Sequence, residues 1–344
     1  MSPLILCILM TTLAMGTLIT LMSNHWLMAW AGLEINMLSI MPLIAKSHHP
    51  RATEATTKYF LAQAGASMLM LFSSTMNAWN TNTWDITQLT NPYACTLLTT
   101  ALCMKMGLAP LHLWLPDTMQ GTPLSTSFII ATWQKLAPMG LIIMTHNSHS
   151  KLMLLTMASA SIFIGGWGGL NQTQLRKLLA YSSIANMGWM VIIVSTTPKL
   201  TSMTLILYIM MLTALFSMMI SHKTNTIKTI SETWTLSPAM MTMLLLILIS
   251  LGGLPPMTGF LPKWLILNEL ITETYTTIAT LIAMATLLSL FFYLRLFYAT
   301  TMTISPNATT NEQKWRQTTQ NVYMMTLLVP PTLLLLPMLT PVLS

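Results

Sequence analysis

The sequence predicts an all-α polytopic membrane protein with about eleven transmembrane helices. Only 7% of the 344 residues are Asp, Glu, Lys or Arg, and 53% are hydrophobic, whereas charged residues make up about 25% of an ordinary soluble domain. The apolar residues occur in runs of roughly 20, the length that a helix needs to cross a bilayer. Lipid is therefore the expected solvent of the chain, and a soluble globular fold is excluded.

Eleven apolar spans, each long enough for one transmembrane helix, follow one another between polar links. They comprise residues 3–22, 25–44, 58–78, 94–115, 123–144, 151–170, 177–196, 200–220, 237–272, 275–298 and 321–342. The ninth span would be about 50 Å long as a straight helix at 1.5 Å per residue, more than one crossing needs. We therefore expect it to be interrupted.

The positions of the Lys and Arg residues support this count. If the N-terminus lies in the positive compartment, the loops and helix ends on that side carry Lys46, Arg51, Lys58, Arg176, Lys177, Lys223, Lys228, Arg295, Lys314 and Arg316. The opposite side carries only Lys151 and Lys199. Such an asymmetry is expected of a correct topology. It explains the net charge of +7 without nucleic-acid binding.

Two spans contain helix-breaking residues. The fourth has Gly107 and Pro110, and the ninth has several Gly and Pro residues in the stretch 251–263. Proline removes a backbone donor and clashes with the preceding turn, and interrupted helices in opposite orientations are typical of inverted-repeat transporters. We predict a single membrane domain over 1–344. It comprises a first five-helix repeat (1–146), a second five-helix repeat (147–298), and a loop on the positive side with a final helix (299–344).

Four ionisable side chains lie inside the spans: Glu34, Lys105, Lys135 and Lys263. A charge at the bilayer centre costs about 2.5–3.5 kcal/mol on insertion scales, and such residues usually mark ion or proton pathways. We expect them to face the interior of the bundle and to carry protons. Each also has a structural interpretation. The glutamate could be a hydrogen-bonding group, the two central lysines could extend to an interface, and Lys263 could neutralise the carbonyl groups of a half-helix.

His112 is a further candidate for proton transfer. It follows Lys105 by seven residues, which places it nominally on the same helical face about 10 Å farther along. Histidine titrates near neutral pH and could relay a proton through water. A buried structural role explains the residue equally well.

No pattern in the sequence indicates a metal or cofactor site. Cys7, Cys95 and Cys103 form no C-x-x-C pair and have no His at ligand spacing. There is also no Gly-rich phosphate-binding loop. We predict no catalytic residue, no metal and no bound cofactor in this chain, so that any redox chemistry takes place elsewhere.

Four segments together resemble the chain 2 family of mitochondrial NADH–ubiquinone oxidoreductase, the smallest antiporter-like subunits in the membrane arm of respiratory complex I. They are residues 31–36 (AGLEIN), 105–117, 133–138 (WQKLAP) and 251–264. The resemblance covers the whole chain. It implies two inverted five-helix repeats with discontinuous fourth and ninth helices. It also implies that the four buried charges form the family's charged axis at mid-membrane.

The resemblance further implies a place for the chain in the cell. It would be a multi-pass subunit of the mitochondrial inner membrane, with its N-terminus in the matrix and its C-terminus in the intermembrane space. Neighbouring antiporter-like subunits, accessory subunits and phospholipid such as cardiolipin are the implied partners, and nucleic acid is not. NADH, FMN, iron–sulfur clusters and ubiquinone would be handled by other subunits of the H+-translocating NADH:ubiquinone reductase.

We expect the chain to couple electron transfer to proton pumping. A charge change at Glu34 and Lys105 would drive a proton through Lys135 towards Lys263, with water bridging the gaps. One alternative is a stand-alone cation/proton antiporter, which has the same fold. The other is a purely structural membrane-arm subunit, whose buried charges would be dispensable for pumping.

Overall fold

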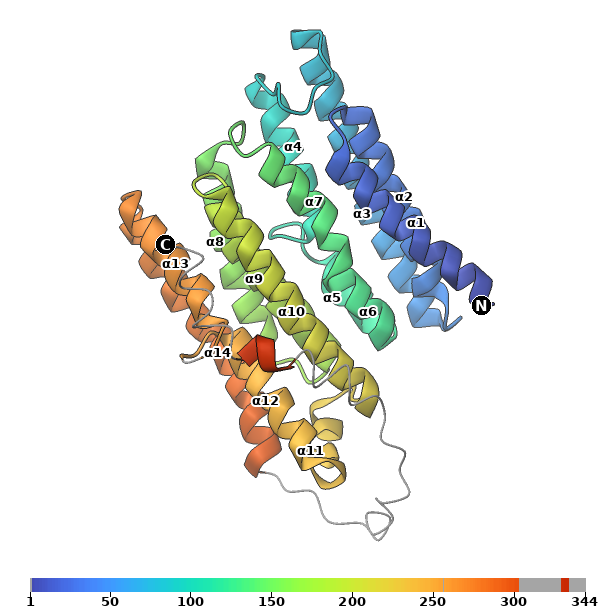
Figure 1. The fold of residues 1–344 in the computed structure, drawn as a ribbon, viewed down its shortest axis with the longest axis vertical. Coiled ribbons are helices and arrows are strands. Elements are labelled where there is room, and N and C mark those ends of the chain that lie inside the picture. Colours follow the sequence, from blue (N-terminus) through green and yellow to red (C-terminus); the bar gives the residue numbers. More distant parts are fainter. Residues whose placement is uncertain (1, 256, 303–328, 334–344) are drawn as a thin grey trace. The chain divides into compact units, whose positions relative to one another are not determined.

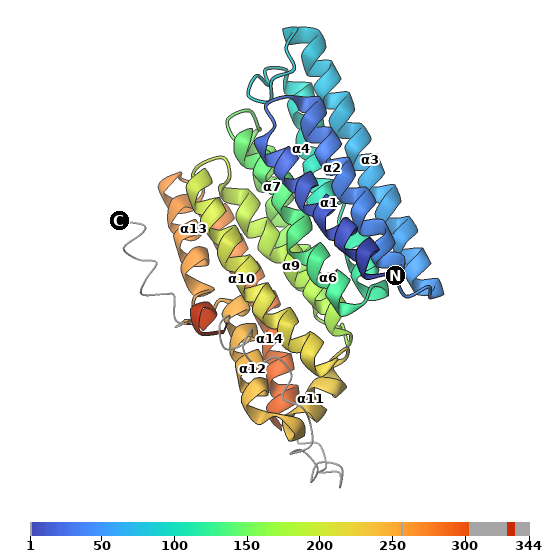
Figure 2. The same cartoon turned by 45° about the vertical axis from the view of Figure 1, so that its right-hand side comes forward.

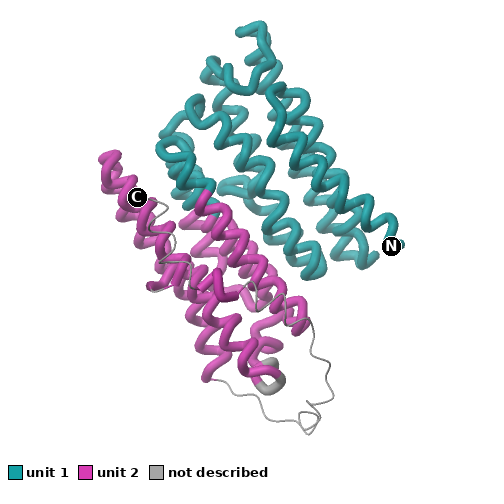
Figure 3. Tube along the Cα trace, viewed as in Figure 1, with its two compact units in different colours: residues 1–161, 187–202 teal, residues 162–186, 203–344 magenta. Residues whose placement is uncertain are grey.

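The predicted all-helical class is confirmed. The computed structural model describes residues 2–255, 257–302 and 329–333, and these residues form helices joined by short turns, without a β-strand (Figure 1). The chain divides into two compact units (Figure 3). Unit 1 comprises residues 1–161 and 187–202, and unit 2 comprises residues 162–186 and 203–344.

The helices follow one another in this order: α1 (Pro3–Met22), α2 (Trp26–Ala45), α3 (Pro50–Thr81), α4 (Pro92–Met106), α5 (Trp114–Gly121), α6 (Leu124–Ala131), α7 (Trp133–Met144), α8 (Lys151–Gly169), α9 (Leu175–Ile193), α10 (Pro198–His222), α11 (Ile227–Leu236), α12 (Pro238–Gly252), α13 (Phe260–Thr272) and α14 (Thr276–Met302). Six of the described helical stretches are long and apolar enough to cross a bilayer: α1, α2, α6 with α7 as one stretch, α8, α10 and α14.

Local start signals set the beginning of α3. Pro50 occupies the first turn, where its missing N–H is not needed, and the His49 side chain accepts a hydrogen bond from Arg51 N. The helix therefore begins at Pro50, before the span that was expected over residues 58–78. The polar segment ahead of that span is helical from Pro50 onward, and the expectation that all of it is a link is wrong. At 32 residues, α3 is about 48 Å long at 1.5 Å per residue.

Small residues let α1 and α2 pack closely, side by side in both views (Figure 2). A Cβ on Gly16 would lie 2.3 Å from Asn36 Oδ1, and a Cβ on Gly32 would lie 2.6 Å from Thr20 Cγ2. Within the same unit α2 packs on α3, and α3 packs on α4 and α5. In unit 2, α14 packs against α11, α12 and α13.

The two predicted breaks are present and have the same local geometry. Gly107 caps the 15-residue helix α4 and Gly253 caps the 15-residue helix α12, each in a left-handed conformation with φ of 78°. The N–H of each glycine donates to helix carbonyls, and the following residues, Leu108 and Leu254, donate to Cys103 O and Ile249 O. Glycine adopts this conformation without steric penalty and is the usual C-terminal cap.

A third irregularity was not predicted. The stretch over residues 124–144 is distorted at Thr132, where φ is −112° and ψ is −69°, and this distortion separates α6 from α7. The Thr132 hydroxyl donates to Phe128 O at 2.8 Å. The distortion places Lys135 in the first turn of α7 and not in the middle of a continuous helix.

Replacing Gly253 by Ala is expected to destabilise the fold. A left-handed conformation costs a non-glycine residue about 1–2 kcal/mol, and the new Cβ would lie 2.8 Å from Lys263 Cδ and 2.9 Å from its Nζ. The melting temperature of the purified protein should fall. Gly252→Ala is the matched control, because its Cβ would meet, among the described residues, only Tyr293 Cδ2 at an ordinary contact distance of 3.5 Å. Equal melting temperatures for both variants would contradict the argument.

Candidate functional site

Three of the predicted site residues lie on helices that pack together in unit 1. Glu34 is on α2, Lys105 is on the last turn of α4, and Lys135 is on the first turn of α7. Helix α7 contacts both α2 and α4. The side chains of Lys105 and Lys135 belong to residues only 5% and 3% exposed, whereas Glu34 is partly exposed. The two lysines thus face the interior of the unit, as expected.

Glu34 and Lys105 influence each other through space. The carboxyl group of Glu34 interacts electrostatically with the Lys105 ammonium. Within the described part of the chain, however, no ion pair within 4.0 Å joins Glu34 to Lys105. A change of charge on one group therefore changes the free energy of protonating the other without a direct contact.

Neutral side chains satisfy the carbonyl groups at the end of α4. Gln63 Nε2 donates to Lys105 O at 3.3 Å, and Trp114 Nε1 donates to Met104 O at 3.0 Å. The last carbonyl groups of a helix lack intrahelical partners and need such donors. Because Gln63 and Trp114 supply them, the Lys105 side chain is not required for this capping.

Lys263 caps the corresponding helix end in unit 2. It lies on α13, and its Nζ donates to Gly252 O at 2.8 Å and to Leu251 O at 3.5 Å. The C-terminal end of a helix carries a partial negative charge that favours a cation. These hydrogen bonds directly support the structural interpretation of Lys263, in which it neutralises the carbonyl groups of a half-helix.

The expected position of His112 is wrong in one respect. Since α4 ends at Met106, His112 lies in the turn before α5 and does not continue the helical face of Lys105. It is 7% exposed, and its Nδ1 lies 3.2 Å from Pro110 O. This local contact offers a structural explanation for the residue, and its part in proton transfer stays a prediction.

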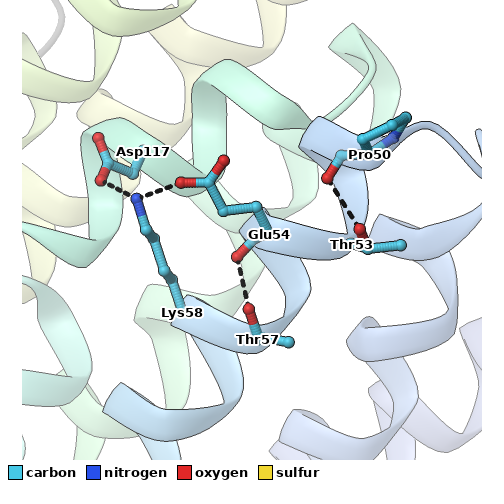
Figure 4. Close-up of polar contacts among 6 residues, drawn as sticks. All are labelled: Pro50, Thr53, Glu54, Thr57, Lys58 and Asp117. Carbon is cyan, nitrogen blue, oxygen red and sulfur yellow. Dashed lines mark hydrogen bonds and ion pairs between the residues drawn. The ribbon is translucent and has the colours of Figure 1, made fainter.

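An ion-pair cluster on the surface of unit 1 was missed by the sequence analysis (Figure 4). Lys58 Nζ lies 2.7 Å from Glu54 Oε1 and 2.8 Å from Asp117 Oδ2. With Arg51 and Gly121, among others, these residues line a pocket of about 180 Å³. The four-residue spacing of Glu54 and Lys58 is a signal for a helical pair. Nothing in the sequence indicates the contact with α5.

The cluster joins α5, the short helix that follows the break at Gly107, to α3. Asp117 belongs to α5, and Lys58 to α3. Gly121 permits the close approach, because a Cβ there would lie 2.6 Å from both Ala55 Cβ and Arg51 O. Among the described residues no group of three His, Cys, Asp or Glu side chains could hold a metal ion.

Two family models match the sequence over almost its whole length. The model described as "NADH:quinone oxidoreductase/Mrp antiporter, TM" matches residues 23–289. The model described as "NADH dehydrogenase subunit 2 C-terminus" matches residues 290–344.

Curated relatives extend the similarity over whole chains. NADH-ubiquinone oxidoreductase chain 2 of Carassius auratus is 53% identical over 345 residues, covering 100% of this chain and 99% of the relative. The protein of the same name from Struthio camelus is 53% identical over 315 residues, covering 92% and 91%.

Solved structures share the fold. A chain of respiratory complex I from Thermus thermophilus matches with a TM-score of 0.83 and 25% identity, over 96% of this chain and 78% of that one. A chain of the Mrp complex from Dietzia sp. matches with a TM-score of 0.75 and 17% identity, over 88% and 61%.

Proposed function

This chain belongs to the NADH:quinone oxidoreductase/Mrp antiporter family, and we propose that it translocates protons through its buried charged side chains. It is an antiporter-like membrane subunit of respiratory complex I, an NADH:quinone oxidoreductase. One observation carries the assignment of the site. Two lysines that are almost fully buried, Lys105 and Lys135, lie on packed helices, and Glu34 acts electrostatically on the first of them.

The proposed path uses Glu34, Lys105, Lys135 and Lys263 as proton carriers. A change of charge delivered from a neighbouring subunit alters the charge balance between Glu34 and Lys105. A proton then passes by way of Lys135 and water towards Lys263. His112 serves as an additional relay beside Lys105. Proton transfer is the only chemical change that we propose for this chain, and no other covalent bond forms or breaks in it.

The proposed fold has eleven transmembrane helices arranged as two inverted repeats, residues 1–146 and 147–298, followed by residues 299–344. The matching break geometry of α4 and α12 supports the repeat. So does the sequence: residues 107–117 read GLAPLHLWLPD, and residues 253–263 read GLPPMTGFLPK. Their offset, 253 − 107 = 146, equals the length of the first repeat. Most of the eleventh span, at 321–342, lies outside the described residues.

The proposed setting is the mitochondrial inner membrane. The excess of Lys and Arg on one side supports an orientation with the N-terminus in the matrix and the C-terminus in the intermembrane space. Other membrane-arm subunits and phospholipid such as cardiolipin cover the exposed apolar side chains. NADH, FMN, iron–sulfur clusters and ubiquinone belong to other subunits.

Reconstitution separates this function from that of a stand-alone antiporter. Assembled complex in liposomes should acidify the lumen when NADH and quinone are supplied from outside. The chain alone, reconstituted at the same density, should exchange no Na+ or K+ for protons under an imposed gradient, because the driving charge change comes from its neighbours. Measurement with a pH-sensitive dye checks both. Ion exchange by the isolated chain would refute the proposal in favour of an antiporter.

A further inference from the structure

Helix α3 carries two buried polar side chains that contact the helices of two predicted site residues, Lys105 and Lys135. Tyr59 and Gln63 are 0% and 4% exposed, and their four-residue spacing puts them on one face of the helix. Gln63 contacts the end of α4 through Lys105 O. Tyr59 Oη donates to Gln134 Oε1 at 2.9 Å and so contacts α7.

Tyr59 also connects to the other parts of the site. The Glu34 carboxyl group interacts with it electrostatically. Its ring meets the Trp114 ring edge to face, with centroids 5.8 Å apart, and Trp114 in turn caps α4 at Met104 O. Tyr59 thus contacts α7, which carries Lys135, interacts with Glu34, and reaches the end of α4 by way of Trp114.

The hydrogen bond from Tyr59 to Gln134 is made at the first turn of α7. The first N–H groups of a helix have no intrahelical partner, and the distortion at Thr132 puts such a helix start next to Lys135. Lys135 N donates to Thr132 O at 3.3 Å, slightly longer than a usual N–H···O hydrogen bond. A side-chain hydrogen bond to Gln134, one residue away, restricts the orientation of this turn. Gln134 is partly buried, so its Oε1 is better satisfied with this donor than without it, and the hydrogen bond favours one orientation of the turn.

We propose that Tyr59 is a positioning residue for proton transfer, holding the first turn of α7 so that Lys135 can exchange protons with the Glu34–Lys105 region. The role rests on the proposed function, since it acts through Lys135. Tyr59 itself need not gain or lose a proton.

Tyr59→Phe in the assembled complex tests the inference, because it removes the hydroxyl and keeps the ring against Trp114. We expect the number of protons translocated per electron to fall by about the same fraction as in Lys135→Met. The KM values for NADH and quinone should be unchanged. The double variant should be no worse than Lys135→Met alone, since two changes on one route are not additive.

Controls separate the possible outcomes. Tyr93→Phe makes the same chemical change at an exposed tyrosine and should leave the ratio unchanged. If Lys135→Met pumps normally, the proposed function itself fails. If Lys135→Met is impaired but Tyr59→Phe pumps normally, or if their effects add, the positioning role is overturned. Should Tyr59→Phe fail to assemble, Gln134→Leu breaks the same hydrogen bond from α7, and failure of both to assemble would show a structural role only.

Discussion

Lys105→Met in the assembled complex is expected to reduce coupled NADH:quinone turnover about 100-fold, the lower end of what a proton-transfer group contributes. Lys105 is the buried lysine on which the Glu34 carboxyl group acts electrostatically, and Met cannot carry a proton. The fold should survive, because α4 is capped by Gln63 and Trp114. The substitution also leaves no buried ion-pair partner behind, because Glu34 is partly exposed and lies in no ion pair with Lys105. Turnover and lumen acidification in proteoliposomes provide the measurement.

Two further variants show whether loss of the titrating group explains this effect. Lys105→Arg keeps the positive charge but does not release its proton, so it should be as inactive as Lys105→Met. Lys199→Met, at an exposed position, should retain full activity. An active Lys105→Arg complex would mean that charge alone is needed at this position and that no proton passes through it.

Lys263→Met and Lys263→Gln are expected to differ in stability but not in pumping. Neither side chain can carry a proton, so both complexes should lose proton translocation to a similar extent. Met leaves Gly252 O without the donor now 2.8 Å away, and an unsatisfied buried carbonyl costs about 1–3 kcal/mol. Gln can donate a neutral hydrogen bond there and should recover part of that loss. Thermal unfolding and protons per electron, measured on the same preparations, check the two effects separately.

The contrast distinguishes capping from conduction at Lys263. If Lys263→Gln pumps as well as the native complex while Lys263→Met does not, the residue only holds the helix end. If both pump normally, neither role is needed for turnover. Loss of pumping in both, with loss of stability in Lys263→Met alone, is the result that assigns both roles to this lysine.

The helix breaks were predictable because their causes are local. Gly107 and Gly253 are the residues that a left-handed helix end requires, and prolines follow within a few positions. The membrane class was predictable for a similar reason, since it depends on composition and on the length of apolar runs. The buried state of Lys105 and Lys135 follows from the cost of exposing a charge to lipid.

The contacts between helices were not predictable. The hydrogen bond from Tyr59 to Gln134 joins residues 75 positions apart, and the ion pair of Lys58 with Asp117 joins residues 59 positions apart. Both depend on how neighbouring helices rotate and cross, which periodicity does not determine. The distortion at Thr132 was missed because threonine is compatible with a regular helix.

The 15-residue length of α4 and α12 has a consequence for water. At 1.5 Å per residue each rod is about 22 Å long, while the hydrocarbon layer is about 30 Å thick. Neither helix is long enough to cross the hydrocarbon layer by itself. The turns that begin at Gly107 and Gly253 therefore hold peptide groups at a depth where lipid offers no hydrogen bonds. Such peptide groups are stable only if protein surrounds them or water reaches them, so we expect water to enter the protein interior beside these two turns.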